Sequence, residues 1–330
     1  MTTVFVSHPQ DKLAHYFGDK AMAALQAIAE VRCNPQAREL STAELVAAAQ
    51  GCGALIAYRQ TLGPATLFAA LPELRAFVRC AVDIRTVDVA AASAHGVLVT
   101  RASAGFAPAV SEWIIAAMVD LARGMSRYAE SNHRGQALAP FMGRELREST
   151  LGVIGYGQIA RALCDLALAF GMQVRVAAPE QVAQREGLRQ QSMSSLLAES
   201  HFVVCLAPAN DDTADMFDAA AFAAMQPGAY FINASRGELV NEEALLGALN
   251  TGHLAGCALD VGRAADQMPS PELARHPLVI ATPHIGGLTL PAIDHQALET
   301  VAQIAALQRG EIPPGAVNAA HATRLQRGHL

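Results

Sequence analysis

A glycine-rich turn is the first candidate for chemistry in this sequence. Residues 155–160 read Gly-Tyr-Gly-Gln-Ile-Ala, with an apolar run before them and a helical pattern after them. In this G-x-G-x-x-A spacing Gly155 permits a tight turn, Gly157 lets the backbone approach a pyrophosphate, and Ala160 lets helix and strand pack closely. The free N–H groups at the start of such a helix attract phosphates. The turn therefore predicts a dinucleotide-binding site.

The residue expected to meet the adenosine ribose is not acidic. The next predicted strand leads into Ala177-Ala178-Pro179, where an Asp or Glu would normally hydrogen-bond the 2′-hydroxyl. Glu180 lies beyond a proline, and Arg185 and Arg189 are near enough along the chain to reach a 2′-phosphate. The cofactor is therefore NADP or NAD, with NADP slightly favoured.

The elements that must position this turn alternate along the whole chain. Short apolar runs and helical patterns follow one another, which is typical of βαβ units and parallel sheets. The predicted strands are Thr3–Val6, Ala54–Ala57, Ala76–Cys80, Val97–Val99, Leu151–Ile154, Gln173–Val176, Phe202–Leu206, Tyr230–Asn233, Gly256–Leu259 and Val279–Ala281. The predicted helices include one bracketed by the Ser41–Glu44 capping box and Gly51, then Pro108–Arg123, Gln158–Phe170 and Pro291–Gln308.

Two long helices flank the second series of units, which indicates a discontinuous first domain. The sequence predicts an α/β protein in which a Rossmann-type, doubly wound parallel sheet domain is inserted into a smaller flavodoxin-like α/β domain. We expect residues 104–287 to form the dinucleotide-binding domain and residues 1–103 plus 288–330 the substrate domain. Because clefts between domains are favoured ligand sites, the active site is expected there.

Composition excludes several classes of protein. Hydrophobic residues make up 52% and charged residues 16%, with a net charge of −6, which argues against disorder. There is no dense Lys/Arg stripe of the kind that binds nucleic acid, and no apolar run long enough to span a membrane. The first residues lack the pattern of a signal peptide, and the six cysteines are scattered without CxxC pairs. We therefore expect a cytoplasmic protein with reduced thiols and no metal site.

A set of motifs in the second half of the chain identifies a family. The motifs are Met225-Gln-Pro-Gly-Ala-Tyr-Phe-Ile-Asn-Ala-Ser-Arg-Gly237, Val240-Asn-Glu-Glu-Ala-Leu245, Gly252-His-Leu-Ala-Gly-Cys-Ala-Leu-Asp-Val261 and Thr282-Pro-His-Ile-Gly-Gly287. With them the sequence resembles the D-isomer-specific 2-hydroxyacid dehydrogenases, and a weaker likeness extends the match to roughly residues 50–318. The resemblance implies hydride transfer between a nicotinamide and a 2-hydroxy or 2-keto acid.

The resemblance also implies roles for individual residues. Arg236 would hold the substrate carboxylate and polarise the keto oxygen, and His284 would donate the proton in reduction. The implied cofactor contacts are Gly155, Gly157, Gln158, Ile159, Pro208, Thr213, Ala234, Ser235, Asp260, His284 and Gly286, with Asp260 at the nicotinamide carboxamide. The implied substrate contacts are Arg59, Val82, Asp83 and Arg236. A homodimer across the helix Pro108–Arg123, which carries Trp113, is also implied; the remaining histidines are interpreted as incidental.

One departure from the family concerns the partner of His284. The family has a glutamate that orients this histidine and raises its pKa, but the ungapped position here is Ala265. Asp266 follows at once, so a slip of one residue in the loop would bring a carboxylate to His284. Asp266 is therefore the third predicted catalytic residue. The alternative is that nothing orients the histidine and activity is weak.

The second departure lies in the substrate loop. Asp83 stands where the family usually has glycine, and its carboxylate would repel an anionic substrate unless Arg85 or Arg59 neutralises it. One interpretation is that Asp83 pairs with Arg85. The other is a non-standard substrate that is larger, or that carries a cationic or polar group.

Two functions follow. The first is an NAD(P)-dependent oxidoreductase acting mainly as a 2-keto acid reductase. The alternative is a weakly active or non-catalytic dinucleotide-binding regulator of the same fold.

Overall fold

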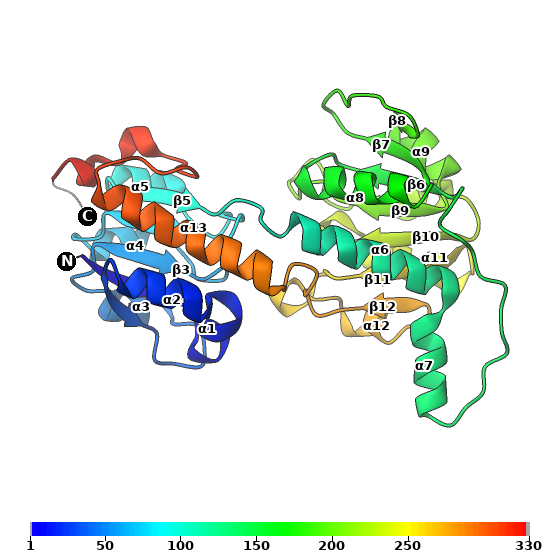
Figure 1. Cartoon of the computed structure of the whole chain (residues 1–330), viewed down its shortest axis with the longest axis horizontal. Coiled ribbons are helices and arrows are strands. Elements are labelled where there is room, and N and C mark those ends of the chain that lie inside the picture. Colours follow the sequence, from blue (N-terminus) through cyan, green and yellow to red (C-terminus); the bar gives the residue numbers. More distant parts are fainter. Residues whose placement is uncertain (1, 328–330) are drawn as a thin grey trace. The chain divides into compact units, whose positions relative to one another are not determined.

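The chain forms two compact units, each with its own parallel sheet (Figure 1). A computed structural model describes residues 2–327, with the side chains of Asp266 and Arg327 outside that description. Unit 1 contains the residues up to Gly105 and those from Thr289 onward, and unit 2 is the continuous segment Phe106–Leu288.

The sheet of unit 1 has five parallel strands in the order β2-β1-β3-β4-β5. This is the 2-1-3-4-5 order of flavodoxin-like folds. The strands are β1 (Thr3–Val6), β2 (Glu30–Cys33), β3 (Ala54–Ala57), β4 (Ala76–Arg79) and β5 (Leu98–Arg101). The central strands β3 and β4 are buried along their whole length, which explains why their residues, apart from Arg79 at the end of β4, are apolar.

Helices cover both faces of the unit 1 sheet. They are α1 (Gln10–Tyr16), α2 (Gly18–Gln26), α3 (Thr42–Ala48), α4 (Ala65–Ala70), α5 (Val89–Ala94) and α13 (Leu290–Gln308), followed by the 3₁₀ turns η3 (Ala319–His321) and η4 (Thr323–Arg327). Helices α2 and α13 share one apolar core with the sheet, and α3, α4 and α5 share the other. The expected capping box of α3 is present, since Ser41 and Glu44 satisfy each other's backbone N–H groups.

The sheet of unit 2 has seven parallel strands in the order β12-β11-β10-β9-β6-β7-β8. The strands are β6 (Thr150–Ile154), β7 (Gln173–Ala177), β8 (Leu188–Gln190), β9 (Phe202–Cys205), β10 (Ala229–Asn233), β11 (Leu254–Leu259) and β12 (Val279–Ala281). In order of appearance this is the 3-2-1-4-5-6 arrangement of a Rossmann fold with one further strand, and the order reverses between β6 and β9. The predicted fold class is confirmed.

The helices of unit 2 likewise lie on both faces of its sheet (Figure 1). They are α6 (Ala107–Arg123), α7 (Met125–His133), α8 (Gln158–Ala169), α9 (Met193–Glu199), α10 (Ala219–Ala224), α11 (Glu242–Asn250) and α12 (Pro271–Ala274), with the 3₁₀ turns η1 (Gly237–Leu239) and η2 (Ala265–Gln267). Helices α6 and α8 share one apolar core, and α9, α10 and α11 share the other. Helix α6 ends at Gly124, whose φ of 64° is the left-handed conformation that glycine adopts readily.

Strands β2 and β8 and helix α7 are among the elements that the sequence patterns did not mark. Strands β2 and β8 are short edge strands, and β2 alternates exposed with half-buried residues instead of forming an apolar run. Helix α7 buries Ser131 alone, so it has no apolar stripe to mark it. The neighbouring segment 136–147 is irregular, as its poor patterning indicated.

Within residues 2–327, no helix is long and apolar enough to cross a membrane. No group of three or more His, Cys, Asp or Glu side chains in that same range is arranged to hold a metal ion.

Candidate active site

The glycine-rich turn lies where the strand order of the unit 2 sheet reverses. Gly155 follows β6 with a φ of +92°, and a Cβ placed on it would lie 2.6 Å from the carbonyl oxygen of Leu206, which follows β9. The turn can therefore pass the end of β9 only with glycine at this position. A Cβ on Gly157 would meet nothing within 4 Å, so the space in front of this residue is open.

Helix α8 begins directly behind that open space. Its N-cap residue is Gly157, which has no side chain to cap the N–H groups of Gln158 and Ile159 in the first turn. Ala160 is fully buried in the core shared by α6 and α8, as the tight packing of this motif requires. Uncapped N–H groups facing open space fit a pyrophosphate, so the residues present are suited to the dinucleotide.

The segment after β7 has no acidic side chain at its start. Ala178 is half-buried, and Glu180 is exposed. Arg185, a candidate for a 2′-phosphate, is paired with Asp165 of α8, and Arg189 is exposed.

Two predicted cofactor contacts form a turn after β9. The Thr213 hydroxyl donates a 2.7 Å hydrogen bond to the carbonyl oxygen of Pro208, and the Thr213 N–H donates to the side chain of Asn210. The structure therefore brings Pro208 and Thr213 together, and the hydrogen bond from the Thr213 hydroxyl stabilises the turn between them.

Arg236 lies three residues beyond the end of β10, in a loop tied to the end of β9. The Asn233 amide donates to the carbonyl oxygen of Arg236 (2.8 Å), and the Ser235 hydroxyl donates to the carbonyl oxygen of Ala207 (2.6 Å). The Arg236 guanidinium donates to the carbonyl oxygen of Ser235 (2.7 Å), and the residue is half-buried. Ala234 and Ser235 are also half-buried, in the loop that carries Arg236.

The loop after β12, which carries His284, is organised by a buried carboxylate. Asp260, only 3% exposed, accepts hydrogen bonds from the Thr282 hydroxyl (2.6 Å) and from the N–H groups of Ile285 and Gly286 (2.8 Å each). His284 sits within this bonded loop with a φ of +56°, an uncommon conformation for a residue with a side chain. The sequence reading placed Asp260 at the nicotinamide and missed that its carboxylate holds the His284 loop.

A close approach of two glycines joins the Arg236 loop to the loop after β11. A Cβ on Gly237 would overlap the backbone of Gly262, and a Cβ on Gly262 would lie 2.5 Å from Pro269 Cα. Ala265 is exposed and begins η2, which contains Asp266. The side chain of Asp266 lies outside the described residues, so its predicted partnership with His284 stays a prediction.

In unit 1 the predicted substrate residues follow β3 and β4. The carboxylate of Asp83 is held by Arg85, whose Nη2 donates at 2.9 Å and whose Nε donates at 3.1 and 3.2 Å. The expected pairing of these two side chains is confirmed. Val82 is half-buried, and the Arg59 guanidinium lies 5.1 Å from the centre of the Tyr16 ring.

A buried arginine beneath this loop was not anticipated. Arg79, the last residue of β4, is fully buried and donates to the carbonyl oxygen of Thr61 (2.7 Å) and the hydroxyl of Thr86 (2.8 Å). Burial lowers the pKa of its guanidinium to about 10. The apolar residues before it predicted a buried strand, but no sequence motif indicated that Arg79 itself would be buried.

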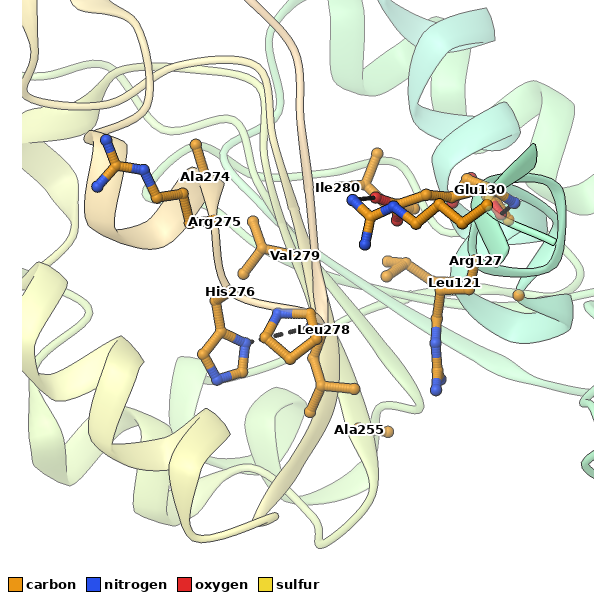
Figure 2. A pocket seen from close by; sticks show the side chains of 15 residues that line it. Leu121, Arg127, Glu130, Ala255, Ala274, Arg275, His276, Leu278, Val279 and Ile280 are labelled. Carbon is orange, nitrogen blue, oxygen red and sulfur yellow. Dashed lines mark hydrogen bonds and ion pairs between the residues drawn. The ribbon is translucent and has the colours of Figure 1, made fainter. Parts of the chain in front are cut away.

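A separate cavity of about 320 Å³ lies beside β12 (Figure 2). Leu121, Leu278, Val279 and Ile280 form much of its apolar lining, and Arg127 with Glu130 comes from α7. No predicted catalytic, cofactor or substrate residue is among its lining residues.

Comparison with known proteins places the chain in a family. The family model described as D-isomer specific 2-hydroxyacid dehydrogenase, NAD binding domain, matches residues 115–286. The chain belongs to this family. This membership shows that unit 2 is a nicotinamide-dinucleotide domain, and it confirms the resemblance drawn from the motifs.

Individual relatives agree with the family. A glyoxylate reductase from Thermococcus kodakarensis is 30% identical over 302 residues, which are 88% of this chain and 90% of the relative. A D-3-phosphoglycerate dehydrogenase from Mycobacterium leprae is 33% identical over 83% of this chain, but the match spans about half (53%) of the relative's length. The crystal structure of the TT0316 protein from Thermus thermophilus superposes with a TM-score of 0.87 at 29% identity, covering 96% of this chain and all of that one.

Proposed function

We propose that this protein is an NAD(P)-dependent oxidoreductase that transfers a hydride between the nicotinamide and a 2-hydroxy or 2-keto acid, acting mainly as a 2-keto acid reductase. The observation that carries the proposal is the hydrogen bonding of Asp260, which organises the His284 loop at the carboxyl-terminal edge of the sheet that also bears the glycine-rich turn. Ligands of doubly wound sheets bind outside this edge.

The residues have distinct tasks in the proposed reaction. When bound, the nicotinamide supplies the hydride. Arg236 holds the substrate carboxylate and places a fixed positive charge where the keto oxygen becomes negative. His284 donates a proton to that oxygen in reduction and accepts it in oxidation. Asp266, one residue after the family position, provides the carboxylate that orients His284.

The substrate is proposed to be a short, ordinary 2-keto acid such as glyoxylate. The Arg85 guanidinium neutralises Asp83, which removes the reason to expect a cationic substrate. Val82 and Asp83 lie in the loop whose backbone would bind the carboxylate, and Arg59 follows β3 in the same unit. The glyoxylate reductase that matches this chain over 88% of its length supports the same choice.

The cofactor is proposed to be NADP in preference to NAD. Ala178 offers no carboxylate to repel a 2′-phosphate, and Glu180 is exposed, beyond Pro179. The proposal needs no direct arginine contact, because Arg185 is already paired with Asp165.

The protein is further proposed to be a cytoplasmic homodimer. Six cysteines are free, as expected in a reducing compartment. The irregular segment after α7 exposes Leu138 (45%), Phe141 (42%) and Met142 (97%), apolar side chains that a second copy would cover. Light scattering would report the mass, and Met142→Glu is expected to shift it toward that of one chain.

The decisive experiment is a spectrophotometric assay of NADPH and NADH oxidation with glyoxylate, pyruvate and larger 2-keto acids. Turnover that falls by about a thousandfold in Arg236→Gln and His284→Ala would support the reductase, since each would remove a group acting in the transition state. Tight binding of the dinucleotide without turnover of any acid would instead identify a dinucleotide-binding regulator.

A further inference from the structure

Gln190 makes an unusual set of contacts at the ribose end of unit 2. It is the last residue of the edge strand β8. Its Nε2 donates hydrogen bonds to the carbonyl oxygens of Ala178 (2.9 Å) and Glu180 (2.7 Å), and its Oε1 accepts one from the N–H of Val182 (2.9 Å). Both amide N–H groups are thus used, together with one acceptor position of the oxygen.

The three bonded groups belong to the segment that follows β7. In a Rossmann domain the end of this strand meets the adenosine ribose. Residues 178–182 have no helical or strand pairing of their own, and Pro179 has no N–H to contribute to any. The side chain of Gln190 therefore provides backbone hydrogen bonds of the kind that a helix or a strand would otherwise provide for this segment. The buried side chain of Val182 (3% exposed) fixes the far end of the segment.

We propose that Gln190 is a positioning residue for the ribose end of the dinucleotide. It touches the segment and not the cofactor, and it fixes the backbone of Ala178 and Glu180 in one shape. Because position 178 is alanine and carries no carboxylate to hold the ribose, the affinity of this end depends on the shape of the segment. This inference rests on the proposed dinucleotide-dependent function and adds the residue that sets the segment's conformation.

The proposed role of Gln190 does not depend on an arginine that contacts the 2′-phosphate. The nearby guanidinium of Arg185 is paired with Asp165, so the proposal assigns the ribose contact to the backbone of residues 178–180. A 2′-phosphate projects further toward that backbone than a 2′-hydroxyl does. A loosened segment should therefore weaken NADPH binding more than NADH binding.

The test replaces Gln190 with methionine, which has a similar length and cannot form the three hydrogen bonds. Gln191→Met is the matched control, since Gln191 is the next residue and its amide reaches Glu199 on α9 instead of residues 178–182. Dissociation constants for NADPH and NADH are measured by fluorescence titration, and kcat is measured at saturating cofactor. For Gln190→Met we expect the NADPH constant to rise about tenfold and the NADH constant less, with kcat within about twofold of wild type, because binding must then order a segment that the three hydrogen bonds no longer hold. Gln191→Met should match wild type.

Gln190→Glu provides a second, independent readout. At pH 8 the introduced carboxylate faces two carbonyl oxygens, and at pH 5.5 its protonated fraction can donate one hydrogen bond to them. The variant should bind NADPH several-fold more tightly at pH 5.5 than at pH 8, relative to the same ratio for wild type.

Unchanged dissociation constants in Gln190→Met would overturn the proposal. So would a fall in thermal stability and kcat that leaves both constants at wild-type values, since that pattern belongs to a purely structural residue. Failure of the proposed function is distinguishable, because wild type itself would then turn over no 2-keto acid, whatever the dissociation constants of the Gln190 variants.

Discussion

The buried carboxylate of Asp260 accepts a 2.8 Å hydrogen bond from the backbone N–H of Gly286, two residues beyond His284. The same carboxylate binds Thr282 on the other side of the histidine. Strand β11 thereby fixes the loop that follows β12, and a histidine with a φ of +56° is kept in place by bonds to its neighbours.

Replacing this carboxylate should therefore lower both stability and turnover. Asp260→Asn turns one acceptor oxygen into a donor that faces an N–H or hydroxyl, so we expect a stability loss of about 1–3 kcal/mol and a fall in kcat of at least about tenfold. Chemical denaturation and steady-state kinetics measure the two effects. Asp218→Asn, which keeps the acceptor that caps α10, is the control. A kcat equal to wild type would contradict the positioning of His284 by Asp260.

The two glycines of the dinucleotide turn should respond differently to alanine. Gly155→Ala places a methyl group 2.6 Å from the Leu206 carbonyl oxygen at a φ of +92°, so we expect it to cost more than about 2 kcal/mol of stability. Gly157→Ala meets no atom and has a φ of −77°, so its stability should change by less than about 1 kcal/mol. Its methyl group would nevertheless occupy the open space assigned to the pyrophosphate, and NADPH affinity should fall at least about tenfold. Paired thermal melts and cofactor titrations check both, and a Gly157→Ala protein with normal affinity would refute this placement.

Removing the carboxylate of Asp266 should move the pH profile of reduction toward acid. A nearby negative charge raises the pKa of a histidine, and its loss lowers that pKa. Because the proposed reduction needs protonated His284, Asp266→Ala should lose activity at a lower pH than wild type does. The measurement is kcat/KM from pH 5 to 9.

The matched variant for that experiment restores a carboxylate at the family position. Ala265→Glu combined with Asp266→Ala should return the profile toward that of wild type. An unaltered profile in Asp266→Ala would mean that another group, or none, orients the histidine.

His8 should make the protein sensitive to acid. Its ring is buried between Phe17 and Tyr58, at centroid distances of 5.3 and 5.1 Å. Burial lowers the pKa of His8 to about 3, and the Arg79 charge adds to this shift. In the unfolded chain His8 binds a proton near pH 6.5, whereas in the folded chain it does so only near pH 3. The folded state therefore loses stability as the pH falls between these values.

The expected contribution of His8 is about 1.4 kcal/mol per pH unit inside that window. His8→Phe, which keeps an aromatic ring between its two neighbours, should remove this slope from urea-unfolding free energies measured between pH 4 and 6.5. His95→Gln, at an exposed position, should retain it. Equal slopes in His8→Phe and wild type would contradict the assignment.

Much of the fold was predictable because its strands are buried. Strands such as β3 and β9 lie inside parallel sheets and read as unbroken apolar runs, and the start of α6 and its end at Gly124 follow from proline and glycine. Edge strands and helix α7 lack such a signal because they bury little. Their sequences therefore lack the apolar periodicity from which a strand or a helix is predicted.

The sequence predicts the candidate site residues that lie in a recognisable motif. It does not predict the residues that support the site through hydrogen bonds to distant segments. Arg236 and His284 are recognised from their neighbours in the chain. The bonds of Asp260 to Thr282 and Gly286 join different strands, and those of Gln190 depend on how a segment without regular structure folds back on an edge strand. Residue order alone does not encode such long-range partners.

The bonds described for Arg236 and His284 all lie within residues 106–288. Arg59, Val82 and Asp83 belong to the other unit and are supported there by Tyr16, Arg85 and the Arg79 network. Under the proposed function, replacing the loops after β3 and β4 should alter the choice of acid while Arg236 and His284 keep the hydrogen bonds described for them.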